Sequence, residues 1–144
     1  MNASATWKPG ESNIQQYDAV SQSKHTIALD ASPQHTNGPS PMELVLMGLC
    51  ACTSVDVVSI LQKKREPLTG LIVAATAQQA PTPPQVFTHI VLEYRISGNV
   101  SHKAAEDAVH LSKSKYCSVS RMLENSAVIE HVIEYVHQQA LSAE

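Results

Sequence analysis

The alternation of hydrophobic and polar positions divides the chain into short strand-like and helical segments on either side of one long apolar stretch. Before the stretch, the pattern predicts short strands separated by turns, over residues 6–7, 14–20 and 25–30. Residues 31–39 have the composition of a loop. After the stretch, the pattern predicts two strands, two helices and a closing strand, over residues 70–79, 87–97, 101–114, 117–125 and 127–136. This order predicts an α+β fold with antiparallel sheets, in a single domain over residues 1–144.

The apolar stretch itself predicts a helix from Ser40 to about residue 64. Ser40 is a favourable N-cap, Pro41 suits the first helical position, and Glu43 stands three residues after the cap. Pro67 prevents the helix from continuing further. At ~1.5 Å per residue such a helix is roughly 36 Å long.

This helix is apolar on every side of its axis, so every side should be enclosed. The apolar residues that surround the axis are Leu44, Val45, Leu46, Met47, Leu49, Val55, Val57, Val58, Ile60 and Leu61. A domain of 144 residues cannot easily enclose so long a helix alone. We therefore expect an obligate homodimer in which a second subunit covers one face of the helix.

Composition narrows the classes of function. The net charge of -3 and a single Trp and Phe favour neither nucleic acid nor an anionic membrane as a partner. No secretory signal opens the chain, and the longest apolar run, near residues 44–52, is shorter than the roughly 20 residues of a membrane span. Three cysteines are too few for a disulfide scaffold, so we expect a cytosolic protein with reduced thiols. No phosphate-binding glycine loop occurs, and no cofactor is expected.

Cys52 and Cys117 are the candidate functional residues. Cys52 lies within the apolar helix, where Thr53 and Ser54 could donate hydrogen bonds and where Asp56, on the same face, opposes a thiolate. Cys117 lies at the predicted start of a helix, where the helix dipole favours a thiolate. Positive charge surrounds it in sequence, from Lys113, Lys115 and Arg121. Each cysteine can equally be a small packing residue.

Metal binding has weaker support in the sequence. Cys50 is about 200° around the helix from Cys52, so a Cys-x-Cys site fails on a helix and Cys50 is interpreted as packing. The seven histidines are scattered without a ligand spacing. A zinc site formed by Cys52, Cys117 and one histidine would depend wholly on the fold, and no metal is expected.

Three segments carry a resemblance to a known family: residues 38–65, with Cys50 and Cys52, residues 115–120 around Cys117, and residues 87–90. The first resembles the central-helix motif of the OsmC/Ohr family, and the second resembles its second cysteine motif. The likeness is greatest to the YhfA-like branch, which residues 87–90 match as well, and it covers most of the chain. The resemblance implies an intertwined homodimer of α+β subunits with long helices buried at its centre.

The resemblance also implies a thiol-dependent peroxidase that acts on organic hydroperoxides. Carried over by position, Cys52 is the peroxidatic thiol, Cys117 is the resolving thiol, and an external dithiol is the reductant. Family peroxidases activate the thiol with an N-terminal Arg and a Glu near the helix start. Here no Arg precedes Arg65, and Met42 stands at the Glu position, while Glu43 is about 180° from Cys52 and is interpreted as a cap. A non-catalytic thiol or small-ligand binder with the same fold is the alternative.

Overall fold

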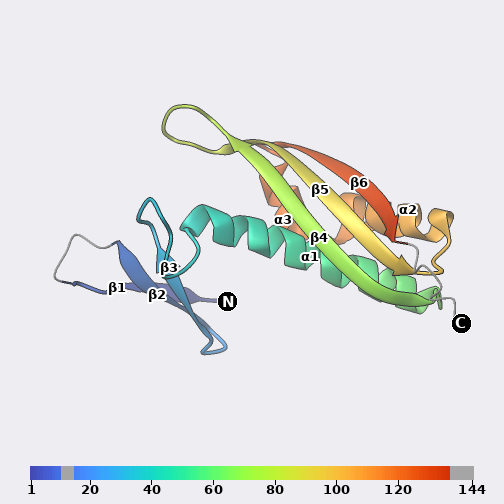
Figure 1. Ribbon diagram of the computed structural model, residues 1–144, viewed down its shortest axis with the longest axis horizontal. Coiled ribbons are helices and arrows are strands. Elements are labelled where there is room, and N and C mark those ends of the chain that lie inside the picture. The colour runs from blue at the N-terminus through green and yellow to red at the C-terminus, as the bar shows by residue number, and fades with distance from the viewer. Residues whose placement is uncertain (11–14, 137–144) are drawn as a thin grey trace, which may run out of the picture. The chain divides into compact units, whose positions relative to one another are not determined.

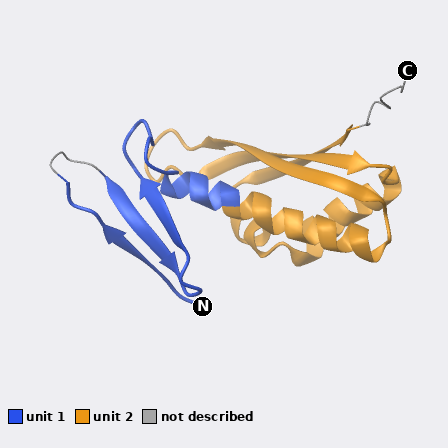
Figure 2. Cartoon of the chain, turned by 60° about the horizontal axis from the view of Figure 1, so that its bottom comes forward, with its two compact units in different colours: residues 1–47 blue, residues 48–144 orange. Residues whose placement is uncertain are grey.

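The computed structural model describes residues 1–10 and 15–136, so the predicted strand start at Ile14 lies outside the described residues. The chain forms two compact units, Met1–Met47 and Gly48–Glu144 (Figure 2). The boundary falls inside the long helix α1 (Pro41–Lys63). A single domain over 1–144 stays a prediction.

The first unit contains an antiparallel sheet in the order β1-β2-β3. Its strands are β1 (Ala3–Trp7), β2 (Gln16–Ser21) and β3 (Thr26–Asp30). The predicted hairpin turn between the last two is confirmed, because the Ser21 N–H donates to the His25 carbonyl at 3.0 Å. This sheet buries little within its own chain: β1 is exposed throughout, and Trp7 is 57% exposed.

The loop after β3 leads into the helix through fixed hydrogen bonds. The buried Asp30 carboxylate accepts from the Ser32 N–H at 2.8 Å and from the Asn37 N–H at 3.1 Å. These bonds, with Ser32 the strongest cause, lower the pKa of Asp30 to about 2. Gly38 passes so close to the Ala28 carbonyl that a side chain would collide with it, which explains a glycine at this position.

The predicted N-terminus of α1 is confirmed. The Glu43 N–H donates to the Ser40 hydroxyl at 3.2 Å, and the Ser40 N–H donates to the Glu43 carboxylate at 2.7 Å. This reciprocal pair is a capping box. Its hydrogen bonds lower the pKa of Glu43, which confirms that this residue serves as a cap.

Only one stripe of α1 is buried within the chain. Its members follow one another four residues apart: Leu49, Thr53, Val57 and Leu61. The opposite side stays open, and Val55 is 69% exposed. By length and composition α1 could cross a membrane, although the sequence had suggested a run too short for one. Core helices of soluble proteins pass the same test, so the finding does not by itself place the helix in a membrane.

The second unit contains a sheet in the order β4-β5-β6 (Figure 1). Its strands are β4 (Leu68–Gln79), β5 (Phe87–Gly98) and β6 (Val128–Val136). The central strand β5 supplies much of the core, since Leu92, Tyr94 and Ile96 are at most 1% exposed.

The expectation of antiparallel sheets needs one correction. β4 and β5 are antiparallel, but β5 and β6 are parallel, with His89 opposite Val128 and Ser97 opposite Val136. Parallel neighbours cannot be joined by a tight turn and need a crossover connection. The helical segment between residues 101 and 127 supplies that connection. Pattern alone gives the strand but not the direction in which it pairs.

The crossover consists of α2 (His102–Leu111), a π-helical turn η1 (Ser112–Tyr116) and α3 (Ser118–Leu123). The break expected after residue 114 is therefore a π turn, in which the Cys117 N–H donates to the Ser112 carbonyl at 2.8 Å. Single π turns inside helices are frequent at functional sites. Here the turn ends at Cys117, which becomes the N-cap of α3.

Candidate functional site: a thiol pair beside a carboxylate

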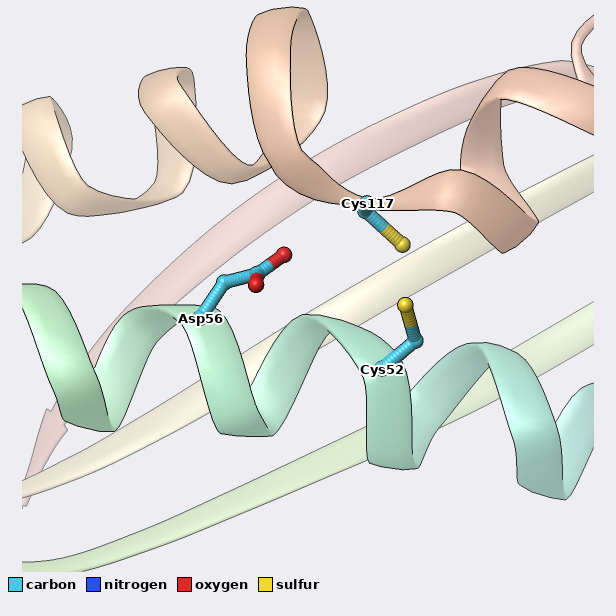
Figure 3. A group of neighbouring side chains, drawn as sticks. All are labelled: Cys52, Asp56 and Cys117. Carbon is cyan, nitrogen blue, oxygen red and sulfur yellow. The ribbon is translucent and has the colours of Figure 1, made fainter.

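The fold brings the two predicted cysteines together. The sulfurs of Cys52 and Cys117 and a carboxylate oxygen of Asp56 all lie within 4.8 Å of one another. Figure 3 shows the two sulfurs pointing toward each other, Cys52 from α1 and Cys117 from the end of η1. Both thiols are free in this structure. A sulfur–sulfur bond is about 2.05 Å long, so the two sulfurs must approach each other by at most about 2.8 Å to form a disulfide.

Cys52 and Asp56 come from successive turns of α1. Residues four apart lie on the same helical face, which explains why the carboxylate reaches the thiol pair. Both side chains are half-buried. The hydroxyl of the buried Ser112, at the start of η1, donates to Asp56 Oδ2 at 2.9 Å. This bond ties the crossover to α1 next to the thiols and holds the carboxylate in place.

Cys117 is far less accessible than Cys52, with 3% of its surface exposed. Its sulfur accepts hydrogen bonds from the Ser120 hydroxyl at 3.1 Å and the Ser120 N–H at 3.4 Å. Burial raises the pKa of Cys117, and the neighbouring Cys52 raises it further, while the Ser120 bonds lower it. The expectation that the helix start would favour a Cys117 thiolate is thus wrong, because loss of hydration outweighs the helix end.

The basic residues around Cys117 in sequence are directed elsewhere. Arg121 pairs with Glu124 at 2.7 Å, and the Lys115 amine lies 5.3 Å from the centre of the Tyr116 ring. Within residues 1–10 and 15–136, no Lys, Arg or His side chain donates a hydrogen bond to either sulfur of the pair. Basic residues near Cys117 in sequence therefore do not provide the thiol pair with a hydrogen-bonded positive charge.

The hydroxyl donors expected beside Cys52 also have other partners. Thr53 donates to the Leu49 and Cys50 carbonyls at 3.2 and 3.1 Å, and Ser54 donates to the Cys50 carbonyl at 2.7 Å. Hydroxyls inside a helix often bond to the preceding turn in this way. These bonds occupy both hydroxyls and leave the Cys52 sulfur without a hydroxyl donor among the described residues.

Cys50 does not join the pair, as the helical geometry predicted. Burial raises the pKa of its thiol, and backbone groups of Ala75 and of Cys50 itself partly offset that rise. The third donor beside Cys52 and Cys117 is Asp56, and none of the seven histidines takes that place in the described cluster. The Cys-Cys-His combination considered from the sequence is therefore not the one that the described residues form, and Asp56 stands in place of a histidine.

Sequence reasoning missed Ser112 and Ser120. The spacing of Ser120, three residues after a helix-starting Cys117, matches that of an N-cap and its N3 partner and could have pointed to it. Ser112 carries no such signal, because its partner Asp56 is 56 residues away in the chain. Contacts of that separation exist only once the crossover is folded.

A pocket of about 340 Å³ adjoins the site. Its lining includes Asp56, the apolar residues Ile60 and Leu111, and Lys63. The neighbouring Lys64, also in the lining, pairs with Asp107 at 3.2 Å. A small amphipathic molecule could therefore lie beside Asp56, whose position on α1 is one helical turn from Cys52.

The fold combines two small sheets with a long helix, and a close pair of thiols lies between that helix and the crossover. This combination is the basis for comparing the chain with known protein families. Residues 33–132 match the family described as OsmC-like protein, and the chain belongs to this family. It is 39% identical over 137 residues to Protein YhfA of Escherichia coli, covering 94% of this chain and 98% of that protein.

Solved structures share the fold. An OsmC-like protein from Mycoplasma pneumoniae superposes with a TM-score of 0.81 at 21% identity, covering 94% of this chain and 96% of that one. An organic hydroperoxide resistance protein OsmC from Legionella pneumophila superposes with a TM-score of 0.68 at 16% identity, covering 93% and 97%. At these identities the likeness concerns the fold.

Proposed function

We propose that this protein is a thiol-dependent peroxidase that reduces organic hydroperoxides through the Cys52/Cys117 pair. The observation that carries the proposal is two free thiols within 4.8 Å whose accessibilities differ. Cys52 is half-buried and can meet a substrate, whereas Cys117 is 3% exposed and can meet Cys52. A structural neighbour named for organic hydroperoxide resistance supports the choice of substrate.

The chemistry follows from this difference in exposure. The Cys52 thiolate attacks the distal oxygen of ROOH, the O–O bond breaks, and the products are ROH and a Cys52 sulfenic acid. The Cys117 sulfur then attacks the sulfenic sulfur, which releases water and forms the disulfide. An external dithiol returns both cysteines to thiols by exchange and is itself oxidised to a disulfide. The two protein thiols supply the two electrons that reduce the peroxide.

The pocket beside Asp56 favours an organic rather than an inorganic peroxide. Ile60 and Leu111 offer apolar surface for an organic group, and this surface begins at Ile60, about two helical turns from Cys52. Hydrogen peroxide has no apolar part to place there. We therefore expect alkyl hydroperoxides to be consumed faster than hydrogen peroxide.

A non-catalytic thiol or small-ligand binder is the second candidate. The observation that favours it is the lack of a hydrogen bond from a described cationic side chain to either sulfur, together with a carboxylate beside them. A nearby negative charge opposes formation of a thiolate. On this candidate the pocket binds its ligand stoichiometrically and no hydroperoxide is consumed.

The experiment is turnover of an alkyl hydroperoxide with a dithiol reductant. Cys52→Ser should abolish turnover, and Cys117→Ser should retain at most one equivalent of consumption with no disulfide. Cys50→Ser, which removes a thiol two residues away on the same helix, is the matched control and should retain turnover. Turnover that persists in Cys52→Ser, or none in the unmodified protein, would refute the peroxidase and favour the ligand binder.

We further propose that the active form is a homodimer and that it works in the cytosol, where thiols are kept reduced. The support for the dimer is exposed apolar surface in both units, including Trp7 at 57%, Val55 at 69% and Ile72 at 58%. Val55→Arg should give monomers in sedimentation analysis. Ser118→Arg introduces the same charge at an exposed site on α3 and should remain dimeric. A monomeric unmodified protein would refute the dimer.

A further inference from the structure

The Cys52–Asp56–Cys117 cluster has the donor set of a metal site as well as that of a redox pair. Two thiolates and a carboxylate are ligands that Zn²⁺ accepts, and a mononuclear site with three protein ligands leaves the fourth position open. The three donor atoms come from two elements, α1 and the end of η1, and lie within 4.8 Å of one another. We propose that the reduced cluster binds one Zn²⁺ per chain.

The spacing suits tetrahedral zinc. With Zn–S bonds of about 2.3 Å and a tetrahedral angle, two sulfur ligands lie about 3.8 Å apart. The present separations of at most 4.8 Å need to close by no more than about 1 Å. A disulfide would bring the same sulfurs to about 2.05 Å. Separations of up to 4.8 Å therefore include the sulfur–sulfur spacing of a zinc site.

Surrounding hydrogen bonds orient the donors as in an established metal site. Ser112 donates to Asp56 Oδ2, while Oδ1 has no hydrogen bond to a described residue and is available to the ion. Ser120 donates to the Cys117 sulfur through its hydroxyl and its N–H. Partners of this kind hold metal ligands in place, and their loss typically weakens metal binding 10–100-fold.

Charge favours an ion at this position. Two thiolates and a carboxylate carry three negative charges in a half-buried site, and no described cationic side chain hydrogen-bonds to the sulfurs. Zn²⁺ would compensate most of that charge and displace the two thiol protons to solvent. While the ion is bound, neither sulfur is available to attack a peroxide or its partner. Zinc would therefore hold the pair reduced and inactive.

The inference uses the same residues as the proposed peroxidase but does not require peroxidase activity. Zinc binding is measured on the full-length reduced chain without peroxide, by competition with a chromophoric chelator. Co²⁺ is a second probe, whose thiolate charge-transfer absorption reports sulfur ligation directly. A chain that binds zinc but consumes no hydroperoxide would refute the function above and leave this inference standing.

We expect one Zn²⁺ per chain in the unmodified protein and in the matched control Cys50→Ser. Asp56→Asn should weaken binding at least tenfold, and Cys52→Ser and Cys117→Ser at least a hundredfold, since they remove ligands rather than supporting partners. The oxidised unmodified chain should not bind, a test that needs no variant to fold. Absence of binding in the reduced chain, binding retained in Cys52→Ser or Cys117→Ser, or Co²⁺ absorption without a thiolate band would each overturn the site.

Discussion

Replacing His131 should reduce the loss in the free energy of unfolding that this protein shows as the pH falls from neutral to mildly acidic. His131 lies on β6, and its Nδ1 is 3.0 Å from the hydroxyl of the fully buried Tyr94 on β5. Its Nε2 has no partner among the described residues. Burial, and secondarily the charge of Lys113, lowers the pKa of His131 from 6.5 to about 4. The folded chain therefore keeps this ring neutral where an unfolded chain would protonate it.

The sign and size of the effect follow from linkage. Above pH 6.5 the ring is neutral in both states, so its contribution to stability is fully present. Between 6.5 and about 4 only the unfolded state binds the proton, and the free energy of unfolding falls as pH falls. The full difference corresponds to about 3 kcal/mol. Solvent screening at this half-buried site reduces the expected loss to about 1–2 kcal/mol.

The assay is urea unfolding of the unmodified chain and of His131→Gln at about pH 7 and about pH 4.5. The unmodified chain should lose about 1–2 kcal/mol more over this interval than the variant. Comparing the two losses cancels every other titrating group. His110→Gln, an exposed histidine on α2, is the matched control and should behave like the unmodified chain. Equal losses in His131→Gln and the unmodified chain would refute the reasoning.

Three further predictions concern the cap, the loop and the resolving thiol. Ser40→Ala should destabilise the protein by about 1 kcal/mol in urea unfolding, because it removes the capping hydroxyl; no change would contradict the cap. Asp30 has its pKa lowered to about 2, so it stabilises the protein above pH 3.8 and this stability is lost as pH falls toward 2. Asp30→Asn should remove that part of the pH dependence, and an unchanged profile would contradict it. Ser120→Ala should slow disulfide formation about tenfold after one equivalent of hydroperoxide is added. The reason is that the variant lacks a hydroxyl donor to the Cys117 sulfur. Ser118→Ala, two residues earlier and exposed, should leave that rate unchanged.

Elements with local causes could be predicted closely. The start of α1 depends on Ser40, Pro41 and Glu43, which lie within four residues of one another, and the observed capping box matches the prediction. Strand β5 was expected over 87–97 and spans Phe87–Gly98, because its alternation repeats over many residues. The direction in which β6 pairs was not predictable, since it depends on where the crossover returns the chain.

In the candidate site, too, features with local causes could be predicted and features that depend on distant residues could not. The candidate residues Cys52 and Cys117, and the position of Asp56 on the face of Cys52, followed from the sequence motifs and helical periodicity. The distance between the sulfurs did not, because residues 65 positions apart meet only through the packing of the crossover on α1. The charges near Cys117 in sequence also predicted the wrong direction for its pKa. Lys113, Lys115 and Arg121 surround it in sequence, yet burial in the folded chain raises its pKa.

By itself, then, the amino-acid sequence determined which residues form helices and strands and which side chains share a face, since both depend on neighbours within about one helical turn or strand pair. The tertiary structure alone decided which sulfur is accessible, which hydroxyls support the pair, and that a carboxylate rather than a histidine completes the cluster. Exposure and long-range contacts are properties of the packed chain, because they depend on what the rest of the molecule places around each group.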